Sequence, residues 1–130
     1  MKIILFGILI FGALLLLSQN CDDTITASDI ENLVMPDSNV SWSNHISPVF
    51  EVKCVPCHNS QRSDGNVDLS SWSNATRDPS IIFPGSDSTS ILVWTIQRIP
   101  PYSPMPPSVS LKRNHISGIR IWIREGAQNN

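Results

Sequence analysis

The residues with the clearest chemistry form one short stretch, Cys54-Val55-Pro56-Cys57-His58. Two thiols separated by two residues, with an imidazole directly after the second, suit four kinds of site. These are a zinc site, a dithiol redox site, a structural disulfide, and a covalent attachment site for haem. The rest of the chain decides among them, and it holds only three cysteines and three histidines in all.

Three of these chemistries leave part of the sequence unexplained. Zinc takes four ligands, but no second C-x-x-C pair follows, and His45 and His115 lie at spacings that match no familiar zinc site. Thioredoxin-like exchange expects a strand and a βαβ frame, whereas a helical pattern precedes this motif. A disulfide between Cys54 and Cys57 gives His58 no role. We therefore interpret the stretch as a haem-attachment site, with zinc and a disulfide as the open alternatives.

Covalent haem gives all three side chains a role. Cys54 and Cys57 would add to the porphyrin vinyl groups as thioethers, and His58 would bind the iron of one haem c. The sixth position of the iron then takes a second ligand from the chain or stays open.

Met105 is the residue that we predict as distal ligand. It lies in the stretch 99–107, which holds five of the ten prolines, with Pro104 and Pro106 on either side. Because proline fixes φ, this loop loses little freedom when it becomes ordered. The structural alternative is that Met105 fills a gap in the core. Weaker candidates for the iron are His115, His45 and Met35.

The N-terminus predicts export. Lys2 precedes an apolar run over residues 3–17, and these 15 residues are too few for a helix that spans a bilayer, which needs about 20. The run is typical of a signal peptide, and the junction before Cys21 resembles that of a bacterial lipoprotein. We predict a signal peptide over residues 1–20 and lipidation of Cys21, which would place a membrane-anchored protein on the periplasmic or cell-surface side. An uncleaved anchor, or secretion with a spare thiol, is the alternative.

Charge narrows the range of partners. The formal net charge is −2, with no run of basic residues and no phosphate-binding glycine loop, so we expect no nucleic-acid binding. The acidic balance favours redox partners with basic docking surfaces. Residues 21–40 contain no Lys or Arg and predict an acidic flexible tether of about 25 Å, with a short packed helix over 29–35 as the alternative. Residues 41–130 are then the folded domain.

Three stretches predict helices, separated by loops rich in proline and glycine. The first runs from about Pro48 into the motif, with Ser47 as its cap. The second covers 90–98, although its β-branched residues would also suit a strand. The third covers about 113–125, because Ile116, Ile119 and Ile123 form one stripe and Gly126 follows as a C-cap. We expect an all-α fold of three to four helices around one haem.

Tryptophans and arginines are further candidates for contact with the porphyrin, since an indole or guanidinium N–H can donate to a propionate. Each of them more often packs in a core or lies solvated at the surface, so we assign none individually. They are Trp42, Trp72, Trp94, Trp122, Arg62, Arg77 and Arg98.

The motifs, taken in order, resemble the planctomycete-type cytochrome c domain, a group within the class I cytochrome c fold. The resemblance covers about residues 42–127. It implies that Cys54 and Cys57 anchor the haem, that His58 and Met105 bind the iron, and that the first and last helices cross near the haem edge. Many members carry this domain fused to larger ones, which leaves the partner open. The motifs are V-F-E-V-K-C-x-x-C-H, G-x-V-D-L-S, P-G-x-x-x-x-S-x-L, M-P-P and W-I-R-E-G-A.

These observations predict an exported monohaem c-type cytochrome that carries one electron at a time and is not an enzyme. The alternative is a haem-based ligand binder, sensor or peroxidase-like module, which needs an open or displaceable sixth position. A third hypothesis is a surface module in which the haem is only structural.

Overall fold

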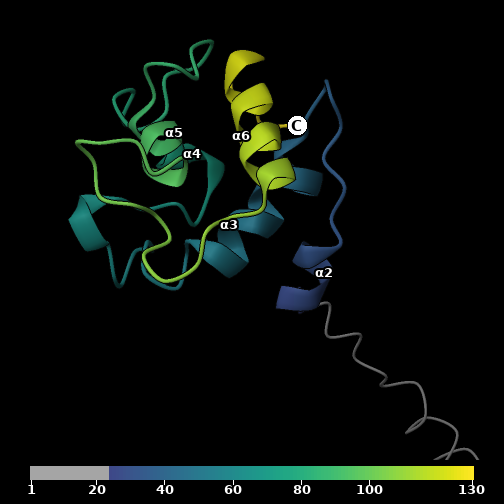
Figure 1. Cartoon of the computed structure of the whole chain (residues 1–130), viewed down its shortest axis with the longest axis horizontal. Coiled ribbons are helices and arrows are strands. Elements are labelled where there is room, and N and C mark those ends of the chain that lie inside the picture. Colours follow the sequence, from purple (N-terminus) through teal and green to yellow (C-terminus); the bar gives the residue numbers. More distant parts are fainter. Residues whose placement is uncertain (1–23) are drawn as a thin grey trace, which may run out of the picture.

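The structure, a computed structural model, describes residues 24–130, and the regular secondary structure in this range is helical (Figure 1). No strand occurs within that range, which agrees with the predicted all-α class, and long loops join the helices. None of the helices in these residues is long and apolar enough to cross a membrane. The predicted signal peptide and Cys21 lie outside the described residues. The α-helices are α2 (Ala27–Glu31), α3 (Ser47–Lys53), α4 (Trp72–Ala75), α5 (Ile91–Ile96) and α6 (Arg113–Arg124), with a π-helical turn at Trp42–Ile46 and a 3-10 turn at Asp64–Asn66.

The helix before the motif begins earlier than predicted. The Ser41 hydroxyl accepts a hydrogen bond from the Asn44 N–H at 3.2 Å and opens the π-helical turn, which runs directly into α3. Pro48 lies in the first turn of α3, as predicted, where a helix needs no backbone donor. Ser47 is already helical and makes no capping hydrogen bond, so the prediction of Ser47 as the cap was wrong.

The second and third predicted helices are both present. The stretch 90–98 contains α5, so the helical interpretation is confirmed over the strand, and α6 matches the predicted range closely. Ile119 and Ile123 are fully buried, as the apolar stripe requires. Gly126 has φ +99° and its N–H donates to the Ile123 carbonyl at 3.0 Å. This is the left-handed cap conformation that favours glycine at a helix end.

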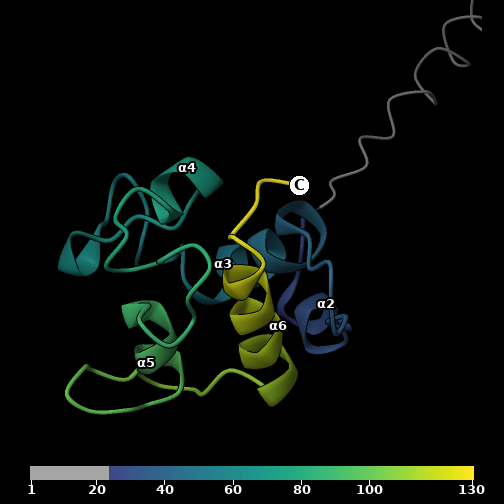
Figure 2. The same cartoon turned by 90° about the horizontal axis from the view of Figure 1, so that it is seen from above.

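Aromatic side chains join the last helix to the first part of the domain. Trp122 of α6 contacts Trp42 and Phe50, with ring centroids 5.4 and 6.4 Å apart, and Trp42 meets Phe50 edge-on at 5.6 Å. Phe50 and Trp122 are each 1% exposed. Figures 1 and 2 show that α6 lies alongside α3. They also show α5 and α2 on opposite sides of α6.

The acidic segment is packed rather than free. A capping box between Thr26 and Asp29 begins α2, and Ile30 is 1% exposed beside α3 and α6. His115 of α6 binds the Ile30 carbonyl through Nε2 at 3.0 Å, and Val40 is also buried. The tether is therefore corrected for residues 24–40, because apolar side chains in this segment have a place in the core. A packed helix is present, as the alternative expected, but it covers Ala27–Glu31 and not 29–35.

The C-terminal residues fasten the start of the domain. The Glu125 carboxylate accepts hydrogen bonds from the N–H groups of Asn39 and Val40, at 2.7 and 3.0 Å. The Asn130 carbonyl accepts from the Ser41 hydroxyl at 2.7 Å and from the Ser43 N–H at 3.0 Å. These bonds hold the π-helical turn, and through it α3, in a fixed position relative to α6.

Candidate haem-attachment site

The motif forms one tight turn at the end of α3. The N–H groups of Cys57 and His58 both donate to the Cys54 carbonyl at 3.0 Å, which brings the two thiols and the imidazole onto a single turn. The turn is also tied to the segment after it, since the Leu69 N–H donates to the His58 carbonyl at 2.9 Å. Both cysteines are free thiols. The three predicted attachment residues are thus brought together by local backbone structure alone.

The Cys54 thiol is in an apolar environment. The residue is 9% exposed, and burial raises the pKa of its thiol to about 12. Zinc binding and dithiol exchange both require a thiolate, which burial of this kind disfavours. A thioether bond to a porphyrin carries no charge, so the same environment suits covalent haem. Cys57 is only half-buried, which leaves the second attachment point closer to the surface.

His58 has a ring nitrogen that its own chain does not satisfy. Its Nδ1 is buried and has no hydrogen-bond partner within residues 24–130. A buried polar nitrogen without a partner is costly. The Nδ1 of His115 is in the same state, so this feature agrees with a bound group at His58 but is not specific to it. The described residues contain no cluster of three or more His, Cys, Asp or Glu that could hold a metal ion. A haem needs only the attachment turn and axial ligands, so these residues fit it.

Met105 lies half-buried in the proline-rich loop between α5 and α6. Its N–H donates to the Thr95 carbonyl of α5 at 3.0 Å. The Arg98 guanidinium closes the loop on the other side, donating to the Pro106 carbonyl at 3.0 Å and to the Ser110 hydroxyl at 2.8 Å. Sequence reasoning credited the stiffness of this loop to proline alone. The structure adds three hydrogen bonds, and it gives Arg98 a loop contact where a propionate contact was considered.

The other candidate iron ligands have structural partners. His115 is 0% exposed and binds the Ile30 carbonyl, and His45 accepts from the Ser41 N–H through Nδ1 at 3.0 Å. Met35 lies against Gly118 of α6, where an added Cβ would come within 2.6 Å of its sulfur. Each of these side chains therefore has a packing or bonding role of its own, as expected for His115.

Three of the four tryptophans donate their indole N–H to a backbone carbonyl. Trp72 donates to the Ala127 carbonyl at 2.7 Å, Trp94 to Ser88 at 2.8 Å, and Trp122 to Gln128 at 2.9 Å. The fourth, Trp42, packs in the aromatic core. These bonds fix loops and chain ends, so none of the three N–H groups is left to donate to a propionate.

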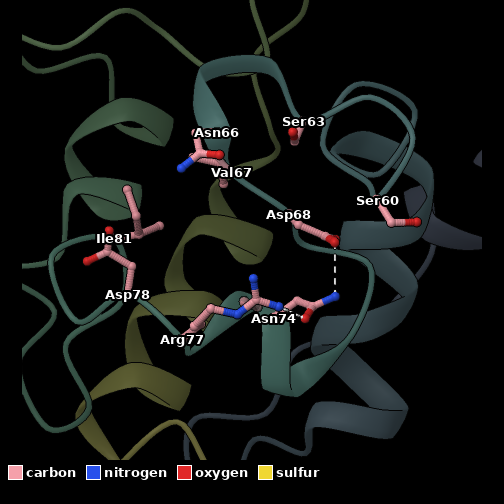
Figure 3. A pocket seen from close by; sticks show the side chains of 10 residues that line it. Ser60, Ser63, Asn66, Val67, Asp68, Asn74, Arg77, Asp78 and Ile81 are labelled. Carbon is pink, nitrogen blue, oxygen red and sulfur yellow. Dashed lines mark hydrogen bonds between the residues drawn. The ribbon is translucent and has the colours of Figure 1, made fainter.

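A cavity of about 490 Å³ begins two residues after the motif, between the loop 60–68 and the segment 74–81 (Figure 3). Arg77 is the one cation among the described residues that line it, and its guanidinium bonds to the Asn74 side chain, which also donates to Asp68 at 2.9 Å. Hydrogen bonds from Ser70 and Ser80 lower the pKa of Asp68 and Asp78, keeping both ionised. Two carboxylates beside one arginine make this cavity a poor site for a propionate.

Arg62, the remaining arginine considered for a propionate, forms an exposed ion pair with Asp64 at 2.9 Å. None of the three arginines thus points to a propionate, and the candidate residues that remain are those of the attachment turn and Met105.

A small all-α fold with two thiols and an imidazole on one turn, and a methionine held on a fastened loop, has the residues that a c-type haem site needs. The family model described as Planctomycete cytochrome C matches residues 54–108, from the first cysteine of the motif to just past Met105-Pro106-Pro107. This match confirms the predicted resemblance over the matched residues, and it suggests a cytochrome c-type haem protein. No curated protein and no solved structure matches the chain.

Proposed function

We propose that this protein is an exported monohaem c-type cytochrome that carries single electrons. Cys54 and Cys57 would hold the haem, and His58 and Met105 would bind its iron. Bound haem supplies a centre that changes oxidation state by one electron, and the protein supplies the ligands and the apolar surroundings. The observation that carries the proposal is the fastening of the Met105 loop to α5.

A thioether is a weak ligand, and it stays on a metal best when its backbone cannot move away. Met105 has its own N–H bonded to Thr95, prolines on both sides, and Arg98 bonded to the next carbonyl along the chain. A loop held in this way favours a permanent sixth ligand. Permanent ligation suits electron transfer, whereas binding of gases or peroxide requires an open or displaceable position.

The test compares Met105→Ala with Met35→Leu, a matched change at the other methionine of the described chain. The ferric wild type should show the weak near-infrared band of thioether ligation and should bind carbon monoxide poorly when reduced. Met105→Ala should lose the band, lower the reduction potential and bind carbon monoxide, since histidine–methionine ligation raises the potential. Met35→Leu should leave all three unchanged. Ready binding of carbon monoxide by the wild type would favour the ligand-binding alternative.

Export and lipidation belong to the same proposal. Covalent haem attachment takes place outside the cytoplasm, which agrees with the apolar N-terminal run and the cysteine that follows it. In a bacterial host, Cys21→Ala should lose labelling by a fatty-acid analogue and move to the soluble fraction, while Cys57→Ser should keep the label. Unchanged labelling of Cys21→Ala would place the lipid elsewhere or nowhere.

A further inference from the structure

Charge is strongly segregated along this chain. Residues 88–124 contain five basic side chains and no Asp or Glu, whereas residues 24–87 contain eight acidic and three basic ones. The basic segment includes α5, the Met105 loop and the whole of α6. A protein of net charge −2 therefore carries five of its nine basic side chains, and no carboxylate, on the segment that holds the proposed distal ligand. The five residues are Arg98, Lys112, Arg113, Arg120 and Arg124.

Few carboxylates reach this segment to neutralise it. Asp87 bonds to Arg120 at 2.7 Å and lies 4.0 Å from Arg124, so one positive charge remains from these three groups. Arg98 bonds to two neutral partners, a carbonyl and a hydroxyl. The Arg113 side chain is exposed and makes no hydrogen bond or ion pair with any residue of the described range 24–130. The surplus charge therefore faces solvent.

Among the described residues, Glu31 is the only other carboxylate bonded to the basic segment. It binds Lys112 at 2.9 Å and is shared with Lys53 at 3.0 Å. One carboxylate between two lysines again leaves a positive charge, so this contact does not neutralise the segment either.

The same segment also exposes apolar side chains. Arg113 and Arg120 line a recess of about 310 Å³ with Gln97, at the end of α5. The loop that joins α5 to α6 exposes 41% of Ile99, 40% of Tyr102 and 68% of Val109. Figure 2 shows this loop running from α5 to the start of α6. Apolar contacts flanked by charged ones are the usual composition of a protein docking surface. We call this surface the loop–α6 face; its residues are Gln97, Arg98, Ile99, Tyr102, Val109, Arg113 and Arg120.

We propose that the loop–α6 face docks a protein partner that presents an acidic surface, and that electrons pass at this contact. The proposal rests on the proposed function, because the loop that carries Met105 forms part of the face. The net charge of the whole chain predicted a basic partner. Charges further than about 10 Å from a contact are largely screened, however, so the local charge decides which surface approaches.

The first experiment measures electron transfer from the reduced haem protein to two small oxidants, anionic hexacyanoferrate and a cationic hexaammine complex. The rate with the anion should fall as salt is added, although the protein is net negative. Arg113→Glu should slow the anion about fivefold at low salt. Arg62→Glu, a matched change in the acidic half, should alter it less than about twofold. Faster reaction of the cation, or equal effects of the two variants, would overturn the proposal.

The second experiment measures binding and does not depend on electron transfer. Addition of poly-L-glutamate to the haem protein should shift amide resonances of residues 97–113 and should lose effect with Arg113→Glu. Binding to poly-L-lysine at the same residues would overturn the proposal. So would binding to anionic phospholipid vesicles without binding to poly-L-glutamate, which would assign the face to a membrane. Failure of Met105 as a ligand would leave the poly-L-glutamate result intact, so the two failures are distinguishable.

Discussion

Removal of the Arg98 guanidinium should release the Met105 loop without unfolding the protein. The side chain makes two hydrogen bonds across the loop, to the Pro106 carbonyl and to the Ser110 hydroxyl. Both are bonds from a charged donor, but both are exposed, so we take about 1 kcal/mol for each. Losing about 2 kcal/mol of loop closure corresponds to a roughly 30-fold larger open fraction, since about 1.4 kcal/mol is tenfold.

The assay follows the near-infrared band of the ferric protein as pH is raised, together with the rate at which the reduced protein binds carbon monoxide. Arg98→Ala should lose the band at lower pH and bind carbon monoxide about 30-fold faster. Arg98→Lys keeps the charge but offers a single ammonium group in place of the planar guanidinium. Its band-loss pH and its rate of carbon monoxide binding should therefore lie between those of the wild type and Arg98→Ala.

Backbone strain needs its own control, because Arg98 has φ +61°. Alanine keeps that strain, whereas glycine relieves it, so Arg98→Gly should raise overall stability above that of Arg98→Ala by about 1 kcal/mol. Both variants should open the loop equally, because both lack the guanidinium. The reasoning is refuted if Arg98→Ala behaves like Arg62→Ala, which removes an exposed arginine whose ion-pair partner, Asp64, is outside the loop.

Three further predictions concern the rest of the fold. Burial lowers the pKa of His115 below 6.5, so its stabilising contribution should be complete above pH 6.5 and should fall as pH drops below that value, by at most about 1.4 kcal/mol per unit. Urea unfolding of wild type and His115→Gln between about pH 7.5 and 5 checks this. Glu31 stays ionised over this range, because Lys112 and Lys53 lower its pKa to about 2. Equal slopes of unfolding free energy against pH for the two proteins would contradict the prediction. Gly118→Ala should destabilise the fold by about 1–3 kcal/mol, although alanine normally favours a helix, because the new Cβ would lie 2.6 Å from the Met35 sulfur. Adding Met35→Ala should recover part of the loss. A rise in the melting temperature of Gly118→Ala would show that the Met35 side chain moves aside freely. The double change Cys54→Ser, Cys57→Ser should lose haem staining on a denaturing gel and give a poorly helical, protease-sensitive chain, since a chain this short has a small core without its cofactor; a sharp melt at full helicity would show that the core forms without haem.

Local sequence signals predicted the parts of this protein that local forces determine. The apolar stripe and Gly126 located α6, and Pro48 located the start of α3, because helix periodicity and caps act over a few residues. The attachment turn needed only the spacing of its three side chains.

The contacts that sequence reasoning missed join residues far apart in the chain. Ile30 and His115 are 85 positions apart, so nothing near residue 30 signals that the acidic segment is packed. The composition of the acidic segment predicted a flexible tether. The segment is packed instead, because Ile30 is buried and its carbonyl is bonded to His115 of α6. Arg98 was considered for a propionate because an arginine shows its charge in a sequence but not its partner. Its bond to Ser110 depends on the course of the intervening loop.

The packing of α2 changes how a lipid-anchored form would meet its partners. If Cys21 carries the lipid, Ala27, the first residue of α2, lies only six positions further along the chain, and six residues span at most about 20 Å. The domain would then stay close to the bilayer in a narrow range of orientations, because no long flexible linker would separate the two. Encounters would depend on lateral diffusion, so turnover would scale with the density of partners in the membrane plane and hardly with their concentration in the bulk.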